Sequence, residues 1–419
     1  MRVAVIGGGM AGLSAAHALL LGGAEPTLFE SSSRAGGKVG SRSEEGFLTE
    51  DGPHFLAKPL EALLEASGLR AEVVTLQGPA KRWVHLGGRV LEAPGLRLLL
   101  AAGVPRALLE PLLARPLRED LSLRAFLVQR FGERAGSLAA AVMAAGVYAG
   151  DAGQLSARDA FPALGARAAK GSLLLGALRR PKTPRSGLWN LRRGLGSLVA
   201  AVAEKLGARV RLGARVERLA PGRFGWQVGS ETFDAVVLAV PAASAAGLCR
   251  IFAPRVTEAL MRFRAAPVTV LHLGFPQAEV PRGFGMLDAD GALHSTGTLF
   301  PSSLLPGRAP EGLALVSTLC GGARHPERAE LPDGILAAAV RVDLRRAFGI
   351  HSEPSYTRVV RHPAAIPQYA PGHSDRVCGA RALLAPFPRL ELAGAAYDGV
   401  GVPDVAQSGA AAAARILKS

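Results

Sequence analysis

Residues 3–12 read VAVIGGGMAG, a short apolar and β-branched run that passes directly into a glycine cluster. The cluster has the spacing G-x-G-x-x-G and consists of Gly7, Gly8, Gly9, Met10, Ala11 and Gly12. The Ala- and Leu-rich residues 11–21 have helical composition, and EPTLFE at residues 25–30 is again strand-like. The order of strand, glycine turn, helix and strand predicts a β-α-β unit that binds a nucleotide diphosphate.

Each glycine of the cluster has a physical task in such a unit. The first permits a tight turn, the second lets the backbone approach the diphosphate, and the third lets the helix pack closely on the strand. The N-terminus of the helix then faces the phosphate charge. Glu30 ends the second strand, where an acidic residue receives ribose hydroxyls. We therefore expect a dinucleotide site at the start of the chain.

Length and composition place the chain among globular proteins. Its 419 residues are enough for two or three domains. Hydrophobic residues make up 49% and charged residues 20%, which excludes a disordered chain. The 51 glycines have no triplet period, which excludes collagen and favours tight turns and close contact with a ligand. Cys249, Cys320 and Cys378 form no C-x-x-C pair, so we predict no disulfide framework and a reducing compartment.

The charge is strongly basic, with 49 Lys and Arg against 34 Asp and Glu, and favours anionic partners. Residues 158–193 hold nine basic residues and one acidic residue around the apolar SLLLGAL at 172–178. Only Phe161 and Trp189 are aromatic there, so nucleic acid is not expected as a partner. A basic insertion with an apolar helix predicts a membrane-surface contact, and a solvated Arg-rich face is the alternative. The uncharged residues 3–24 are assigned to the β-α-β unit and not to a membrane span.

Further elements follow from periodicity and from turn residues. We predict helices and strands over residues 59–67 (helix), 81–91 (hairpin around Gly87 and Gly88), 198–206 (helix), 209–219, 226–228 and 235–240 (strands), 334–348 (helix), 390–393 (strand) and 404–417 (helix). Residues 96–176 have helical spacing broken by prolines, which predicts a helical insertion.

Two further segments identify the nucleotide. After Glu30 the chain continues as SSSRAGGK, which sets Arg34, Gly36, Gly37 and Lys38 in an E-x3-R-x-G-G arrangement. This arrangement resembles the second flavin motif of the amine-oxidase-like FAD enzymes.

The second of these segments, LELAGAAYDGVGVPD at residues 390–404, resembles the last flavin motif of the same enzymes, whose backbone passes beside the isoalloxazine. A helix beginning at Asp404 would direct its positive end at the flavin, where negative charge develops on reduction. Because no cysteine adjoins this motif, a non-covalent FAD is expected.

Five longer phrases narrow the resemblance. They are GVYAGDAGQLSARDAFP (146–162), GTLFPSSLLPGRAPEG (297–312), GGAR (321–324), AIPQY (365–369) and AYDGVGVPD (396–404). With them the chain resembles, end to end, the oxygen-dependent protoporphyrinogen oxidases of haem synthesis. The related coproporphyrinogen III oxidases share most of these phrases. One departure is the loop Asp288-Ala289-Asp290-Gly291, where the family often has a proline-containing loop.

The resemblance implies an α/β fold with an FAD-binding Rossmann-like domain of the amine-oxidase type, a mixed-sheet substrate domain and a helical insertion. The segments assigned to these parts are 1–79, 186–245 and 386–419 (FAD-binding), 80–91 and 246–385 (substrate-binding) and 92–185 (insertion, facing a membrane).

The implied function is oxidation of protoporphyrinogen IX to protoporphyrin IX. A hydride would leave a bridging methylene for the flavin, and dioxygen would reoxidise the flavin with release of hydrogen peroxide. No side chain is required as an obligatory base. The implied location is cytoplasmic, with peripheral contact on the inner face of the membrane, and a homodimer is compatible with the sequence.

The resemblance also implies roles for individual residues. Further FAD contacts are implied for Gly52, Pro53, His54 (through its backbone), Phe55, Val216, Ala395, Val400, Gly401 and Val402.

On the substrate side, Arg82 occupies the place of an arginine that holds a propionate, and Phe284 and Leu287 match an apolar pair around a pyrrole ring. A planar guanidinium suits a carboxylate because it pairs with it in a bidentate way. The alternatives are a solvated strand arginine for Arg82 and plain core packing for Phe284 and Leu287. The glycines of residues 146–150 could also bring a backbone carbonyl to the ring nitrogens.

Other functions stay open at this point. Coproporphyrinogen III is the alternative substrate. An amine oxidase or a carotenoid desaturase would use the same scaffold, although Tyr397 has no evident partner for an aromatic pair beside the flavin. A non-catalytic FAD-fold protein that binds a partner or a lipid is a further alternative. The nine histidines show no spacing typical of a metal site, so no metal is predicted.

Overall fold

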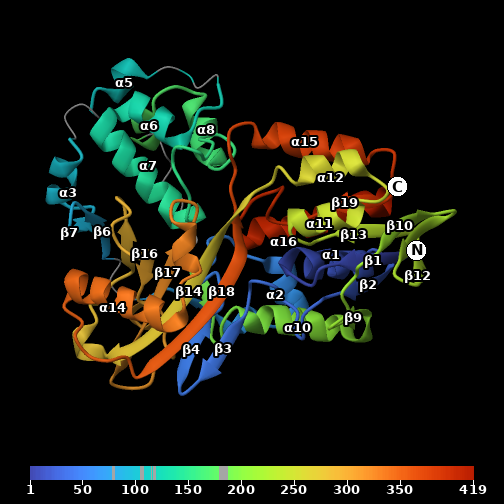
Figure 1. Cartoon of the computed structure of the whole chain (residues 1–419), viewed down its shortest axis with the longest axis horizontal. Helices are drawn as coiled ribbons and strands as arrows, with labels where there is room; N and C mark the ends of the chain where they lie inside the picture. The colour runs from blue at the N-terminus through green and yellow to red at the C-terminus, as the bar shows by residue number, and fades with distance from the viewer. Residues whose placement is uncertain (78–80, 104–107, 115, 117–118, 179–186) are drawn as a thin grey trace.

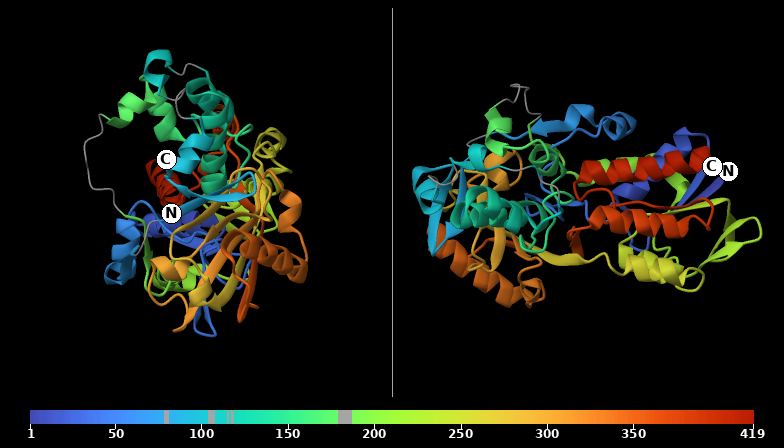
Figure 2. Two further views of the ribbon diagram at one scale, coloured as in Figure 1. Left: turned by 90° about the vertical axis from the view of Figure 1, so that its left-hand side faces the viewer. Right: turned by 90° about the horizontal axis from the view of Figure 1, so that it is seen from above.

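The computed structural model describes residues 1–77, 81–103, 108–114, 116, 119–178 and 187–419. Figure 1 shows a layered α/β body that carries both chain ends, a second body built on long strands, and a helical part beside the second body. The two chain termini lie close together on the first body in all three views (Figures 1 and 2).

A five-stranded parallel sheet forms the centre of the first body, in the order β19-β13-β1-β2-β9. Its strands are β1 (Arg2–Ile6), β2 (Glu25–Phe29), β9 (Val210–Arg211), β13 (Ala235–Leu238) and β19 (Leu390–Leu392). Successive side chains of a strand point to opposite faces, so Val3 and Val5 enter one core while Ala4 and Ile6 enter another. The predicted β-α-β start is confirmed.

Helices cover the face that carries Val3 and Val5. They are α1 (Met10–Leu21), α2 (Glu61–Ser67), α10 (Gly196–Leu206) and α16 (Val402–Lys418). The contact between α1 and α16 leaves no room for a side chain, because a Cβ on Gly409 would lie 2.0 Å from the carbonyl oxygen of Ala11. The last helix is therefore fixed directly on the first one.

The opposite face is covered by three more helices and a small antiparallel sheet. These elements are α11 (Ala242–Cys249), α12 (Pro254–Leu260), α15 (His373–Leu384), β10 (Leu219–Gly222), β11 (Gly225–Val228) and β12 (Glu231–Phe233). The sequence assigned residues 254–260 and 373–384 to the second domain. Their apolar side chains instead pack in the core that contains Ala4 and Ile6.

A seven-stranded mixed sheet forms the second body, in the order β18-β14-β17-β16-β15-β6-β7. Its strands are β6 (Arg82–Leu86), β7 (Arg89–Ala93), β14 (Ala265–Pro276), β15 (Gly285–Asp288), β16 (Ser295–Leu299), β17 (Leu313–Gly321) and β18 (Tyr356–Pro367). The predicted hairpin over 81–91 joins this sheet, because β6 pairs in parallel with β15. One face packs on α14 (Asp333–Phe348) through a core of its own.

The helical part contains α3 (Leu96–Ala101), α5 (Glu110–Leu113), α6 (Leu123–Phe131), α7 (Glu133–Tyr148), α8 (Pro162–Ala168) and α9 (Leu173–Leu178). A core centred on α6 and α7 holds it together, and the end of α7 approaches β15 and β16 (Figure 1). In the described part of the chain, no helix has both the length and the apolar character needed to cross a bilayer.

Shorter elements complete the chain. They are β3 (Ser41–Glu44), β4 (Phe47–Glu50), β5 (Val73–Thr75), β8 (Trp189–Leu191), α13 (Pro301–Leu304) and the 3-10 turns η1 (Arg70–Glu72), η2 (Gly207–Arg209), η3 (Gln277–Glu279) and η4 (Pro326–Ala329).

Two sequence expectations differ from the structure. The strand expected over 209–219 is split into β9 and β10, and between them the amides of Gly213 and Ala214 donate to the carbonyls of Ser32 and Glu30 at 2.8 Å. The last helix begins at Val402, two residues before Asp404. The expected domain limits at 79/80 and 185/186 lie outside the described residues.

Candidate functional site

The glycine turn between β1 and α1 forms an open cradle. Gly7 has φ +104°, which favours glycine, and its amide donates to the Phe29 carbonyl at 2.8 Å. A Cβ on Gly12 would lie 1.8 Å from the Gly7 carbonyl oxygen, so only glycine fits there. No described atom lies within 4 Å of the place that a Cβ on Gly9 would take, and no described side chain caps the helix. An uncapped helix N-terminus that faces free space is an anion site.

Glu30 closes one side of this cradle. Its carboxylate accepts hydrogen bonds from the Gly8 amide at 2.7 Å and from the Ser32 amide at 2.8 Å. Burial opposes ionisation, but hydrogen bonds from Ser32 and Gly8 hold the pKa of Glu30 below its usual range. The Ala214 amide donates to the Glu30 carbonyl at 2.8 Å, which brings the segment that carries Val216 to the same edge.

The second motif folds back onto the first. The Gly36 amide donates to the Gly8 carbonyl at 2.7 Å, and a Cβ on Gly37 would lie 3.2 Å from the Gly9 Cα. The guanidinium of Arg34 bonds Asp51 at 2.6 Å and the carbonyls of residues 35, 37 and 39. Arg34 therefore fixes the conformation of the loop at residues 35–39 through these hydrogen bonds. Half-buried Lys38 has its pKa lowered by burial.

The turn from Gly52 to Phe55 packs on this second motif. A Cβ on Gly52 would lie 2.6 Å from the Lys38 carbonyl oxygen. The Nδ1 of His54 is 2.9 Å from the Gly52 carbonyl, and its Nε2 has no hydrogen-bond partner among the described residues. Burial lowers the pKa of His54 to about 4, so the imidazole is neutral at pH 7.

A buried ion pair supports this turn, and sequence reasoning missed it. Glu50 and Arg308 are 2.9 Å apart, and both side chains are almost fully buried. Asn190 donates to Glu50 at 2.8 Å and to the His54 carbonyl at 2.7 Å. Because Arg308 lies 258 residues beyond Glu50 in the sequence, no local pattern could have paired them.

The C-terminal loop forms the other end of the site. The Gly394 amide donates to the Ser408 hydroxyl at 2.9 Å, and Gly399 has φ +122°. Gly401 precedes the first turn of α16, and no described side chain caps that helix. Val400 contacts the helical core, and Val402 contacts the core of the parallel sheet. The loop therefore lies between the helical part and the body that carries the parallel sheet.

Together these features fit FAD. The space beside Gly9 is open, and a side chain at this position would fill the place that the diphosphate needs. Gly7 and Gly12 must be glycines for another reason, because a Cβ at either position would clash with the protein itself. Glu30 presents a carboxylate at the edge of the cradle. The N-termini of α1 and α16 both belong to long helices that pack on each other. Helix N-termini attract negative charge. The N-terminus of α1 therefore suits the diphosphate, and that of α16 suits a flavin ring that becomes anionic on reduction.

The residues expected to bind substrate lie on the neighbouring strands β6 and β15 or directly before them. The Cζ of exposed Arg82 lies 4.7 Å from the ring centre of Phe284, and that ring is 5.6 Å from the ring of Phe55 in the turn described above. Half-buried Leu287 faces the end of α7, since a Cβ on Gly146 would lie 3.2 Å from its Cδ1. A cation and two aromatic rings therefore meet beside the candidate flavin turn, while Leu287 lies against the end of α7.

Two other sequence hypotheses can be placed on the structure. Within residues 146–150, the carbonyls of Tyr148 and Ala149 each accept one hydrogen bond from the protein, from the Gln368 side chain at 3.0 Å and from the Ala323 amide at 2.8 Å. Tyr397 is buried and packs edge to face on Phe263 at 5.4 Å, in the core of the parallel sheet. It lies in that core and not in the pair of exposed aromatics that an amine oxidase would need.

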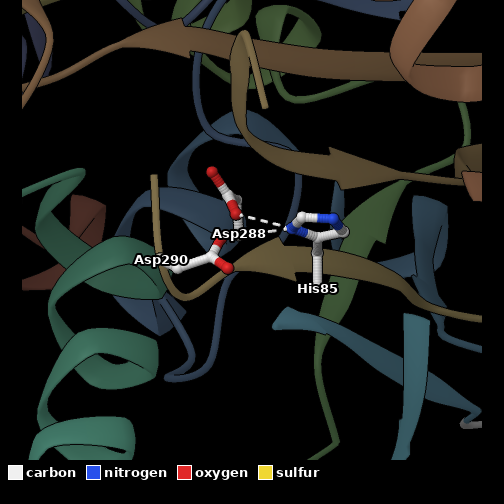
Figure 3. Close-up of side chains that lie close together, drawn as sticks. All are labelled: His85, Asp288 and Asp290. Atoms are coloured by element: carbon white, nitrogen blue, oxygen red, sulfur yellow. Dashed lines mark hydrogen bonds and ion pairs between the residues drawn. The ribbon is translucent and has the colours of Figure 1, made fainter. Parts of the chain in front are cut away.

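A polar cluster that the sequence did not reveal joins the hairpin to the second body. Figure 3 shows the imidazole of His85 directed at two carboxylates, with Nδ1 3.1 Å from Asp288 and 3.2 Å from Asp290. Three ligand-type atoms lie within 4.8 Å of one another. Backbone amides of Leu293 and Gly87 also donate to these carboxylates at 3.0 and 2.7 Å. Burial and the Asp290 carboxyl raise the pKa of Asp288 to about 6.

Comparisons with known proteins agree with this geometry. A family model for flavin-containing amine oxidoreductases matches residues 10–417. Human protoporphyrinogen oxidase is 33% identical over 99% of this chain and 98% of its own. The coproporphyrinogen III oxidase of Propionibacterium freudenreichii is 29% identical over 96% of this chain and 88% of its own. A crystal structure from Exiguobacterium sp., 24% identical, covers 100% of this chain and 98% of its own with a TM-score of 0.88, which supports the fold.

The chain belongs to the flavin-containing amine oxidoreductases, in the branch that holds the protoporphyrinogen and coproporphyrinogen III oxidases. It is thus an FAD-dependent oxidoreductase of the amine-oxidase fold, as the sequence predicted.

Proposed function

We propose that the protein oxidises protoporphyrinogen IX to protoporphyrin IX. The observation that carries the proposal is the meeting of Arg82 with the rings of Phe284 and Phe55 beside the flavin turn. A porphyrinogen is a flat apolar macrocycle with carboxylate arms, so it needs an apolar seat with a cation at its rim. The name and the extent of the human relative support the same substrate.

The roles of the chain's own residues follow from their positions. The N-terminus of α1 with Glu30 would hold the diphosphate and ribose, while residues 52–55 and 395–402 would enclose the ring of the flavin. Arg82 would bind a propionate, and Leu287 with Phe284 would hold a pyrrole ring. The chemistry that bound FAD supplies is acceptance of a hydride from a bridging methylene, followed by reoxidation by dioxygen with release of hydrogen peroxide.

Coproporphyrinogen III is the second candidate substrate, because curated relatives of that name match almost the whole chain. It carries more propionates than protoporphyrinogen IX does. Each further propionate would need a cation besides Arg82.

Oxidation in air tests the proposal. The purified protein should convert protoporphyrinogen IX into a fluorescent porphyrin, consume dioxygen and release one hydrogen peroxide per two electrons removed. Porphyrin formation at the uncatalysed rate would contradict the proposed reaction. Faster turnover with coproporphyrinogen III would assign the second substrate.

We also propose that the helical part touches a membrane from one side. Its α3 and α5 expose leucines, with Leu96 72%, Leu100 69% and Leu112 84% exposed, next to exposed Arg97. Of the basic stretch at 158–193, residues 179–186 lie outside the described part of the chain. Sedimentation with vesicles tests this: binding to anionic but not to neutral vesicles is expected, and Leu100→Asp with Leu112→Asp should abolish it.

A further inference from the structure

The segment AIPQY at residues 365–369 has no part in the proposed reaction, yet its last two residues bond two different parts of the molecule. It comprises the last three residues of β18 and the two that follow, and it packs in the core of the helical part together with Val400 of the C-terminal loop. The Gln368 amide donates to the Tyr148 carbonyl, at the end of α7, at 3.0 Å. The Ser156 amide donates to the Tyr369 carbonyl at 2.7 Å. Neighbouring residues of one segment thus hold the helical part.

Tyr369 also holds the C-terminal loop. Its hydroxyl donates to the Ala395 carbonyl at 2.6 Å and accepts from the Gly399 amide at 2.7 Å. One phenol oxygen therefore bridges the loop across residues 395–399, just before the N-terminus of α16. Gly399 has φ +122°, a backbone conformation that glycine adopts readily and other residues rarely do.

The side chain of Tyr369 is buried and firmly packed. Tyr369 is 3% exposed, and its ring stacks on His373 at 3.6 Å with 13° between the planes. Burial raises the pKa of Tyr369, so its hydroxyl keeps the proton that it donates. Burial also means that the loop groups would lose their partner without gaining water if the hydroxyl were removed.

We propose that Tyr369 is a positioning residue that holds residues 395–399 in the shape that receives the flavin ring, and that Gln368 beside it sets the end of α7 against the same loop. The two residues would thereby fix the distance between the substrate seat and the cofactor. The inference rests on the proposed placement of the flavin beside residues 395–402, and it is independent of which porphyrinogen is the substrate.

The test is Tyr369→Phe, which keeps the stacked ring and removes both hydrogen bonds. Tyr148→Phe is the matched control, because Tyr148 is buried in the same aromatic group and its hydroxyl donates to the Ala160 carbonyl of the helical part at 2.9 Å, with no other partner among the described residues. Each protein would be stripped of FAD and titrated with it. We expect Tyr369→Phe to weaken FAD binding by about tenfold or more, and Tyr148→Phe to stay within about threefold of the unchanged protein.

Thermal unfolding with and without FAD separates positioning from simple support. Tyr369→Phe should narrow the difference in Tm between the loaded and the stripped protein, and Tyr148→Phe should lower both Tm values equally. Equal FAD affinity in Tyr369→Phe and the unchanged protein, or equal losses in both variants, would overturn the inference. If the unchanged protein itself bound no FAD, the flavin assignment would fail instead.

Discussion

At Gly9 the absence of a side chain creates the space that a diphosphate needs. Gly9 has φ −71° and ψ −178°, which any residue adopts, and no described atom lies within 4 Å of its missing Cβ. Gly9→Val should therefore fold as the unchanged protein does and still exclude the cofactor. We expect a colourless protein with a normal circular dichroism spectrum, checked by flavin content per chain. A Gly9→Val protein that purified with stoichiometric FAD would contradict the diphosphate assignment.

Arg82 carries the substrate hypothesis at the same scale. A partly shielded pair between its guanidinium and a carboxylate contributes about 1.5–3 kcal/mol, so Arg82→Ala should raise KM by roughly ten- to a hundredfold. The turnover number should fall less, because a remote clamp acts mainly on binding. Arg82→Lys should recover only part of the loss, because it restores charge without the planar fork.

A matched control for Arg82 lies in the same hairpin. Arg89→Ala removes another exposed arginine, at the start of β7, and should leave KM unchanged. Flavin content should be normal in both variants. If Arg82→Ala and Arg89→Ala gave the same kinetics as the unchanged protein, Arg82 would be a solvated strand arginine.

The turn that follows β4 is held by a buried ion pair between Glu50 and Arg308, which are far apart in the sequence. Removing one partner of a buried ion pair leaves an unpaired charge and costs about 3–5 kcal/mol. Arg308→Ala should lower the free energy of unfolding by that amount and loosen FAD, since Asn190 links Glu50 to the His54 carbonyl. Unfolding in urea measures the change in the free energy of unfolding. Adding Glu50→Gln should restore part of the loss, and no restoration would show that Arg308 acts through packing alone.

The sequence predicted well those elements whose residues lie close together along the chain. The opening β-α-β unit, the hairpin at Gly87 and Gly88, and α14 follow from periodicity and turn residues within a few positions. The Glu50–Arg308 pair and the cluster of His85 with two aspartates join residues more than 200 positions apart. Such pairs depend on how the sheets assemble, and a single sequence holds no local signal for them.

For the whole molecule, buried neutral histidines predict acid sensitivity. Burial lowers the pKa of His54 and of His373 to about 4 and that of His272 well below its usual 6.5. Their unfolded forms bind protons at pH 6.5 and below, so their contribution to stability is complete above that pH and is lost as the pH falls toward 4.

Two buried carboxyls oppose this trend, because the pKa values of Glu50 and Asp288 are raised. Their contribution grows as the pH falls, and it cancels part of the histidine effect. The three histidines outnumber these two carboxyls, so a net uptake of protons on unfolding is expected between pH 6 and 5. Tm should therefore fall steadily from pH 7 to pH 5. A higher Tm at pH 5 than at pH 7 would contradict the neutral buried histidines.

The proposed reaction requires electrons to pass from the porphyrinogen directly into the bound FAD, and anaerobic mixing measures that step by itself. The protein, purified with its FAD, is mixed without oxygen with protoporphyrinogen IX and, separately, with coproporphyrinogen III, while the flavin absorbance is followed. We predict rapid bleaching by protoporphyrinogen IX, slower bleaching by coproporphyrinogen III, and return of the colour when air is admitted. No bleaching with either compound in a protein that holds FAD would contradict the proposed function.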